Sequence, residues 1–214
     1  MKASREQAAE SRERVLDVAA RLFRERGFDG IGVADLMKSA GLTHGGFYGH
    51  FSSKEDLMAQ ATARALSDSL DRWKQAAENA PEQPLAAIAR AFLSAKHRDT
   101  PGRGCAVAAL GSDISRQTGP VRQSVTEGVR QLFDFLSGYM PGRSKAAKRE
   151  RALVAYASMV GAIVVARTLD DAALSQELLD AVAASLPMSV PAAKAPNAEA
   201  PLRPEVETAT SSTD

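Results

Sequence analysis

Cysteine is nearly absent from this chain, which contains one residue of this type, Cys105. A single cysteine excludes an internal disulfide and any cysteine-rich zinc site. An excess of one charge is also missing, because 27 Lys and Arg residues balance 26 Asp and Glu residues, for a net charge of +1. No basic field covers the whole protein, so a DNA-binding surface would have to be a local patch.

Long apolar runs are lacking as well. The longest candidate, residues 154–166, is too short to span a bilayer. The N-terminus is polar and charged, unlike a signal peptide. We therefore expect a cytoplasmic protein without a membrane partner.

Strand-forming patterns are also scarce, whereas alanine is abundant, and this composition predicts an all-α fold. Hydrophobic residues make up 44% of the chain and charged residues 25%, as in soluble globular proteins. The spacing of apolar residues predicts helices over 4–26, 33–40, 54–79, 85–93, 104–110 with a polar extension to 117, 120–139, 146–169 and 171–186. A polar loop is predicted over 96–103.

The stretch from Gly41 to Glu55 organises the N-terminal part of the chain. Gly41 can adopt positive φ at little cost, so it can end the short helix over 33–40 and turn the chain. Thr43 can then cap a second short helix. Two short helices joined by a tight glycine turn form a helix-turn-helix, whose second helix enters the major groove of DNA.

The second of these helices carries a longer pattern: a small residue, then Phe47, Tyr48, His50, Phe51, Lys54, Glu55 and Leu57 at fixed spacing. In this pattern the chain resembles the TetR/AcrR family of transcriptional regulators, over roughly residues 11–60. The resemblance implies an N-terminal three-helix DNA-binding domain. It also implies a long helix that leads to a C-terminal helical domain for effector binding and dimerisation.

The spacing of Phe47 and Phe51 predicts that both rings face inward and pack the short helix onto the first helix. The resemblance implies that the outward positions bind DNA, and the candidate set is Thr43, His44, Gly45, Gly46, Tyr48, His50 and Lys54. For His50, a phosphate contact and a packing role within the domain both stay open. Gly49 departs from the larger residue that the family often has there, which leaves one contact in doubt.

The segment Ser52-Ser53-Lys54-Glu55 is typical of a capping box and marks the start of the long helix. Pro81 and Pro84 limit its far end. We therefore divide the chain into a DNA-binding domain over 1–54 and an effector and dimerisation domain over 55–186. Residues 187–214, rich in Pro and Ala and without periodicity, are predicted to form a disordered tail.

The resemblance further implies an effector pocket in the second domain. Its candidate lining is Phe92, Leu93, Cys105, Leu110, Phe133 and Tyr156, although core packing is the favoured role for any single one of these residues. For Cys105 two interpretations stay open. Its place at a helix start next to Arg103 favours a reactive thiolate that senses oxidants or electrophiles, whereas free cysteines are commonly small buried hydrophobes.

One recognition helix covers half a site, so regulators of this geometry bind as two-fold dimers. The last two helices carry the surplus of apolar residues, and two from each subunit would form a four-helix bundle. The predicted interface comprises Met159, Val160, Gly161, Ile163, Val164, Leu178, Leu179 and Val182.

Other functions lack the residues they need. The spacing of His44 and His50 does not suit a shared metal ion. No Ser-His-Asp or paired-carboxylate set stands out for catalysis. Nothing in the sequence predicts a cofactor. We therefore expect a ligand-responsive regulator, a repressor that binds a palindromic operator as a homodimer and is released by a small effector. The alternatives are a repressor that senses oxidants or electrophiles through Cys105, and a DNA-binding protein without an effector.

Overall fold

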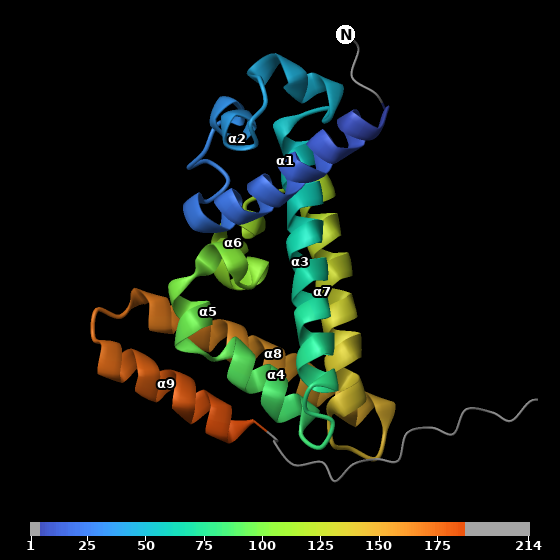
Figure 1. Ribbon diagram of the computed structural model, residues 1–214. Coiled ribbons are helices and arrows are strands. Elements are labelled where there is room, and N and C mark those ends of the chain that lie inside the picture. Colours follow the sequence, from blue (N-terminus) through green and yellow to red (C-terminus); the bar gives the residue numbers. More distant parts are fainter. Residues whose placement is uncertain (1–4, 187–214) are drawn as a thin grey trace, which may run out of the picture.

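The computed structural model describes residues 5–186, and within this range every regular element is a helix, as the sequence predicts (Figure 1). The elements are α1 (Arg5–Arg26), α2 (Val33–Ser39), η1 (His44–Gly49), α3 (Lys54–Glu78), α4 (Pro84–Phe92), α5 (Ala95–Asp99), η2 (Pro101–Arg103), α6 (Ala106–Ser115), α7 (Gly119–Tyr139), α8 (Lys145–Thr168) and α9 (Ala172–Ser185). Ser4 and the predicted tail, residues 187–214, lie outside the described residues.

Glycines at positive φ end both helices before the recognition segment. Gly27, at φ 77°, follows α1, and Gly41, at φ 72°, follows α2, which confirms the predicted turns. Gly41 is left-handed because a residue without Cβ can turn the chain there without steric cost. The element after it differs from the expectation, because η1 is a 3₁₀ helix and the side chain of its cap, Thr43, makes no capping hydrogen bond.

The long helix α3 has 25 residues, which corresponds to about 37 Å. Its cap lies one residue later than the predicted box: the Ser53 side chain accepts from the Asp56 amide. The Asp56 carboxylate in turn accepts from the amide and the hydroxyl of Ser52. The acidic partner is therefore Asp56 and not Glu55, because Asp56 is three residues after the true cap.

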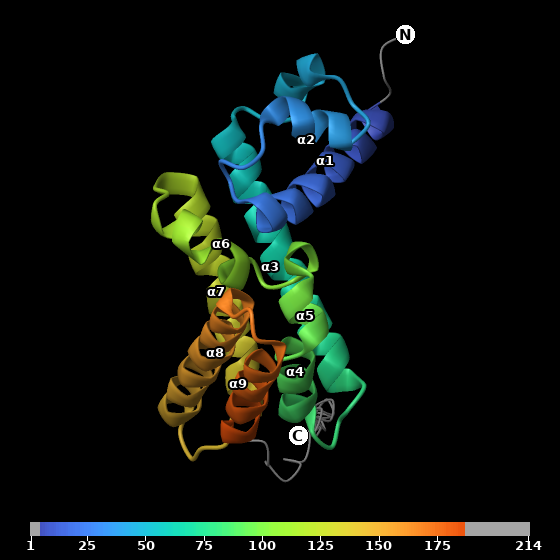
Figure 2. The ribbon, with the colours of Figure 1, turned by 90° about the vertical axis from the view of Figure 1, so that its left-hand side faces the viewer.

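Helices α3 and α7 run side by side along the length of the molecule (Figure 1). At one end α1 crosses α3, and α2 and η1 lie beyond it. Toward the other end α4 and α8 pack against the α3–α7 pair, and α9 packs on α8 (Figure 2). The shared helix α3 thus takes part in the packing of both ends.

The segment predicted as a loop over 96–103 folds into α5 and η2 instead. Ser94 caps α5 by accepting from the His97 amide, and Pro101 occupies the first turn of η2. Both elements are too short to show apolar periodicity, which is why the pattern of the sequence misses them. The next helix, α6, starts at Ala106 with Cys105 as its cap, and extends to Ser115.

Helix α8 is apolar on most sides, yet only one of its faces is buried in the described chain. Its buried face includes Ala152, Tyr156, Met159 and Ile163. The opposite face is exposed, and its large apolar side chains are Leu153, Val154, Val164 and Val165. By length and composition α8 could cross a membrane, yet it packs against α7 and α9, as the core helix of a soluble protein does.

Candidate nucleic-acid interface and effector region

The two inward-facing rings of the recognition segment are buried as predicted. Phe47 is 1% exposed and Phe51 is 2% exposed, and their ring centroids lie 5.7 Å apart. The guanidinium of Arg12 in α1 lies over the Phe51 ring, 5.4 Å from its centroid. The Arg12 contact joins α1 to the residues just after η1, and η1 itself packs against α2.

Tyr48 follows Phe47 in η1, but its side chain points outward. Its side chain is 74% exposed, the most exposed of the large hydrophobic residues in the described chain. The ring of Tyr48 meets the buried Phe47 ring edge-on at 5.2 Å, which orients it without covering it. An exposed aromatic residue held by a buried neighbour is suited to contact a partner.

The other candidate DNA contacts lie on the same exposed end. Thr43, His44 and Gly45 are exposed, and Gly46, His50 and Lys54 are half-buried. A Cβ atom on Gly45 or on the neighbouring Gly49 would meet nothing within 4 Å. Packing inside this chain therefore does not require glycine at either position, whereas a surface that approaches the backbone from outside would.

Comparison with known proteins agrees with this geometry. The model of the family described as bacterial regulatory proteins, tetR family, matches residues 15–61, which hold α1, α2, η1 and the start of α3. Over these residues the chain is similar to the TetR family. The residues that carry the match include Phe47, Tyr48 and Phe51, whose opposed orientations are described above.

Relatives within the TetR family are similar over part of their length. The chain is 39% identical to the HTH-type transcriptional regulator AcrR of Shigella flexneri over 57 residues, which cover 27% of this chain and 26% of that one. It is 33% identical to the HTH-type transcriptional regulator TtgR of Pseudomonas putida over 91 residues, 42% of this chain and 43% of that one. The chain thus spans about a quarter and about two fifths of these relatives.

The fold is similar over a longer range. The crystal structure of the reduced form of NemR from E. coli matches with a TM-score of 0.71 and 23% identity, covering 86% of this chain and 100% of that one. At this identity the likeness shows the fold alone.

The candidate pocket residues form a packed core. Five of them are buried, and Phe133 is half-buried: the buried ones are Phe92, Leu93, Cys105, Leu110 and Tyr156. Trp73, which sequence reasoning missed, joins them, with its ring 6.0 Å from Phe92 and 6.1 Å from Tyr156. Phe133 meets Tyr156 edge-on at 5.2 Å. In this conformation the rings fill the space that an effector would need.

Cys105 lies at the edge of this aromatic cluster. It is 3% exposed, and its Sγ lies 3.7 Å from the Tyr156 hydroxyl. Burial next to the thiol raises the pKa of Tyr156. The expected neighbour, Arg103, is exposed at the surface, and the arginines that interact electrostatically with the thiol are Arg24, Arg72 and Arg167. The accessible thiol of the sensing interpretation is therefore absent from this conformation.

His97 holds the backbone next to Cys105. Its Nδ1 lies 2.6 Å from the Phe92 carbonyl, and its Nε2 accepts from the Cys105 amide at 2.8 Å. Burial lowers the pKa of His97 to about 4, and the positive charges of Arg167, Arg72 and Arg24 add to this effect. The ring is thus neutral and carries its proton on Nδ1, since Nε2 must accept.

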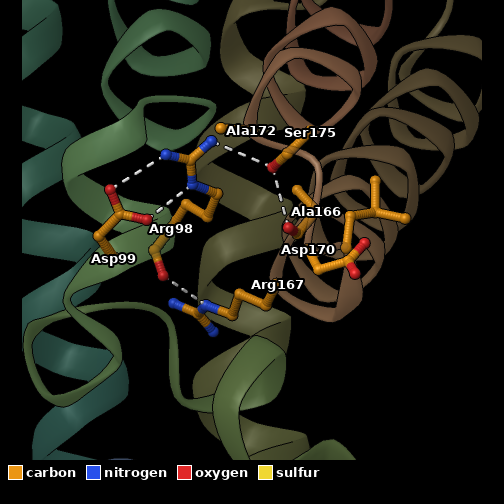
Figure 3. A pocket seen from close by; sticks show the side chains of 8 residues that line it. Arg98, Asp99, Ala166, Arg167, Asp170, Ala172 and Ser175 are labelled. Carbon is orange, nitrogen blue, oxygen red and sulfur yellow. Dashed lines mark hydrogen bonds and ion pairs between the residues drawn. The ribbon is translucent and has the colours of Figure 1, made fainter.

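A cavity of about 240 Å³ lies at the junction of α5, α8 and α9, away from the aromatic cluster (Figure 3). The guanidinium of Arg98 pairs with Asp99 and donates to the Ser175 hydroxyl. Arg167 donates to the carbonyls of Arg98, His97 and Ala108. The guanidinium groups of Arg98 and Arg167 already have hydrogen-bond partners. They therefore join the three helices, and the cavity does not need a ligand to satisfy them.

The predicted dimer residues divide into two groups. Met159, Ile163 and Leu179 are completely buried in the core of their own subunit, so their assignment to a surface between subunits is wrong. Gly161 and Val164 are exposed, and Val160, Leu178 and Val182 are half-buried. The apolar surplus of the helix was visible in the sequence, but which face belongs to the subunit core depends on packing against α7 and α9.

Proposed function

We propose that this chain is a transcriptional repressor that binds a palindromic operator as a homodimer and is released by a small effector. The single observation that carries the proposal is the exposed face of η1, where Tyr48 stands 74% exposed beside the buried Phe47. Similarity to the TetR family supports it, because the matched residues 15–61 include this face.

The DNA-binding set is proposed unchanged: Thr43, His44, Gly45, Gly46, Tyr48, His50 and Lys54. Tyr48 and Lys54 would contact phosphates, and Lys54 at the start of α3 brings a positive charge to the same end. His44 is the proposed base contact, because it is exposed at the N-terminus of η1, the end of a recognition helix that meets base edges.

For the dimer we propose the exposed apolar face of α8 with its neighbour on α9. This face comprises Leu153, Val154, Ala157, Gly161, Val164, Val165 and Leu174. Four of these residues are large hydrophobics on one side of a single helix, a pattern that marks a protein interface rather than solvent-exposed surface. The proposed domains, 1–54 and 55–186, separate this face from the DNA-binding end.

Release by an effector would require the aromatic cluster to open. The six pocket candidates stay proposed as its lining, with Trp73 added. The rings of Trp73, Phe92, Phe133 and Tyr156 contact one another between α3, α4, α7 and α8, and Cys105 lies against Tyr156. The packed state of this cluster is the observation that favours an alternative, a DNA-binding protein without an effector.

A sensing role for Cys105 is a further alternative. NemR, described in its reduced form, has a similar fold, and three arginines interact electrostatically with the thiol of this chain. Guanidinium groups near a cysteine stabilise its thiolate. The burial of Cys105 means that the second domain would have to open before an oxidant or electrophile reached it.

The test is selection of bound duplexes from a random DNA library with the purified protein. We expect enrichment of an inverted repeat and two protein chains for each duplex in sedimentation. Enrichment of no sequence, together with binding that vanishes at moderate salt, would leave only non-specific attraction and reject the proposal. The selected duplex then serves to screen small molecules, oxidants and electrophiles for release.

A further inference from the structure

The C-terminal end of α1 and the residues just after it contact the effector domain at two places. One is η2, just before α6, and the other is the last turn of α6. At the first, Arg24 donates from Nε at 3.0 Å and from Nη2 at 2.6 Å to the Gly102 carbonyl in η2. At the second, the amide of Phe28 donates to Oδ2 of Asp113 at 3.1 Å. These partners are 78 and 85 residues apart in the sequence. We propose that the two contacts together position α1, and with it the DNA-binding end, relative to α6.

Next to each contact lies a glycine that leaves room for a carboxylate side chain of the facing segment. A Cβ on Gly102 would lie 2.3 Å from Oε1 of Glu25 in α1. A Cβ on Gly27 would lie 2.7 Å from Oδ2 of Asp113. Gly27 also has φ 77°, which turns the chain after α1 so that the Phe28 amide is free to leave the helix.

The contact between Arg24 and Gly102 is costly to break because the guanidinium charge of Arg24 is buried. Arg24 is 8% exposed, and its pair of bonds goes to a neutral carbonyl, while Nη1 has no hydrogen-bond partner among the described residues. The adjacent carboxylate, Glu25, pairs with Arg21 at the surface. If η2 moved away, a buried guanidinium would lose its partners, which is costly. Arg24, and therefore α1, has to follow η2.

The Asp113 contact adds a second fixed point. Phe28 is 1% exposed, and its ring meets Phe23 edge-on at 5.3 Å, so its backbone is anchored in the core of the N-terminal domain. Asp113 also pairs with the exposed Arg116 through its other oxygen, at 2.7 Å. One contact would permit α1 to pivot. Two contacts, one just before α6 and one in the last turn of α6, define the orientation of α1.

The path toward the DNA-binding end is short. Helix α1 packs on α2, and Arg12 of α1 lies over Phe51 next to the recognition segment. A displacement of α6 would therefore reach η1 through α1 as well as through α3. The consequence for DNA rests on the proposed function, whereas the positioning itself does not.

The test measures the distance between the two domains without DNA. Spin labels are placed at the exposed positions Lys38 in α2 and Gln123 in α7, in a Cys105→Ser background, with excess unlabelled protein so that one labelled subunit is observed at a time. Asp113→Ala and Arg24→Met should each shift or broaden the distance distribution by about 2 Å. Matched controls are Arg116→Ala, which keeps the Phe28 bond, and Arg21→Met, one turn before Arg24 on the exposed surface.

Hydrogen exchange gives a second readout. The Phe28 amide should exchange about tenfold faster in Asp113→Ala than in Arg116→Ala, because only the first loses its acceptor. If Arg24→Met does not fold, Asp113→Ala decides alone, because its carboxylate is partly exposed and removing it opens no core cavity. Distances and Phe28 exchange equal to those of the controls would overturn the inference.

The DNA arm separates this inference from the proposed function. Asp113→Ala should weaken binding of the selected duplex about tenfold relative to Arg116→Ala. Failure of the wild-type protein to select any duplex would reject the proposed function and leave the distance result to decide the positioning role. Unchanged duplex affinity in a variant whose distances have shifted would overturn the link between α6 and DNA binding.

Discussion

The two ends of this molecule differ in the exposure of their aromatic residues. At the N-terminal end, Tyr48 stands 74% exposed beside the buried Phe47, and two glycines nearby leave open space. In the effector domain, Trp73, Phe92 and Tyr156 turn their rings toward one another, and all three are buried. One end leaves an aromatic ring exposed, whereas the other is already filled by its own side chains.

The difference teaches where a binding role can be seen in a structure without ligands. A surface that meets a rigid partner such as duplex DNA can be formed in advance, so its residues are exposed when the partner is missing. A pocket for a small apolar molecule collapses onto itself when it is empty, because protein interiors close-pack. The exposure of Tyr48 therefore supports a binding role directly, whereas a binding role for the buried aromatic cluster needs experiments that open it.

The largest expected effects contrast the two faces of α8. Ile163→Asp places a carboxylate at a completely buried position and should destabilise the fold by about 3 to 5 kcal/mol, or prevent folding. Val154→Asp, at a position 62% exposed, should leave the thermal unfolding of the subunit nearly unchanged and split the dimer in sedimentation. A Val154→Asp protein that stays dimeric would place the interface elsewhere.

Neighbouring aromatics of the recognition segment provide the next contrast. Phe47→Ala should cost about 3 to 5 kcal/mol of unfolding free energy, because it empties a buried site. Tyr48→Ala should change stability by about 0.5 kcal/mol or less and weaken DNA binding to every sequence about tenfold. Urea unfolding and fluorescence anisotropy measure the two quantities. Equal loss of stability in both variants would mean that Tyr48 has a packing role.

The effector domain should lose stability as the pH falls. The folded-state pKa of His97 is about 4, below the value of 6.5 that the unfolded chain has, so unfolding takes up a proton between these values. The contribution of neutral His97 is complete above pH 6.5 and is lost as the pH falls toward 4, by on the order of 2 to 3 kcal/mol. Urea unfolding at several pH values should show this slope in the wild type and a shallower one in His97→Gln. Parallel slopes would contradict it.

The smallest expected effect is at the start of α3. Lys54→Ala should reduce the salt dependence of DNA binding by about one phosphate contact per subunit, while Lys74→Ala, exposed farther along the same helix, should leave it unchanged. The measurement is the slope of log affinity against log salt for both variants. Identical slopes would remove Lys54 from the set of DNA contacts.

Local signals could be read from the sequence. Gly27 and Gly41 end their helices at positive φ, and the spacing of Phe47 and Phe51 fixed which side of the segment is inside. The register of the cap on α3 was missed by one residue, because Ser52 and Ser53 are both good caps and only the geometry chooses between them.

Contacts between distant segments could not be predicted in this way. The bond of Arg24 to Gly102 and the meeting of Trp73 with Tyr156 join residues from separate helices, and no local pattern marks them. The same holds for Met159 and Ile163, which are as apolar as the exposed Val154 and differ from it only in the direction they face.

The most direct test of the account is photo-crosslinking from both ends of the molecule. A photoreactive amino acid at position 48 or at position 174, where Leu174 is 48% exposed, is activated in the presence of the selected duplex. We predict that position 48 crosslinks to DNA and position 174 to a second copy of the chain. A crosslink from position 48 to protein, or from position 174 to DNA, would contradict the claim that the exposed face of η1 is the DNA-binding surface.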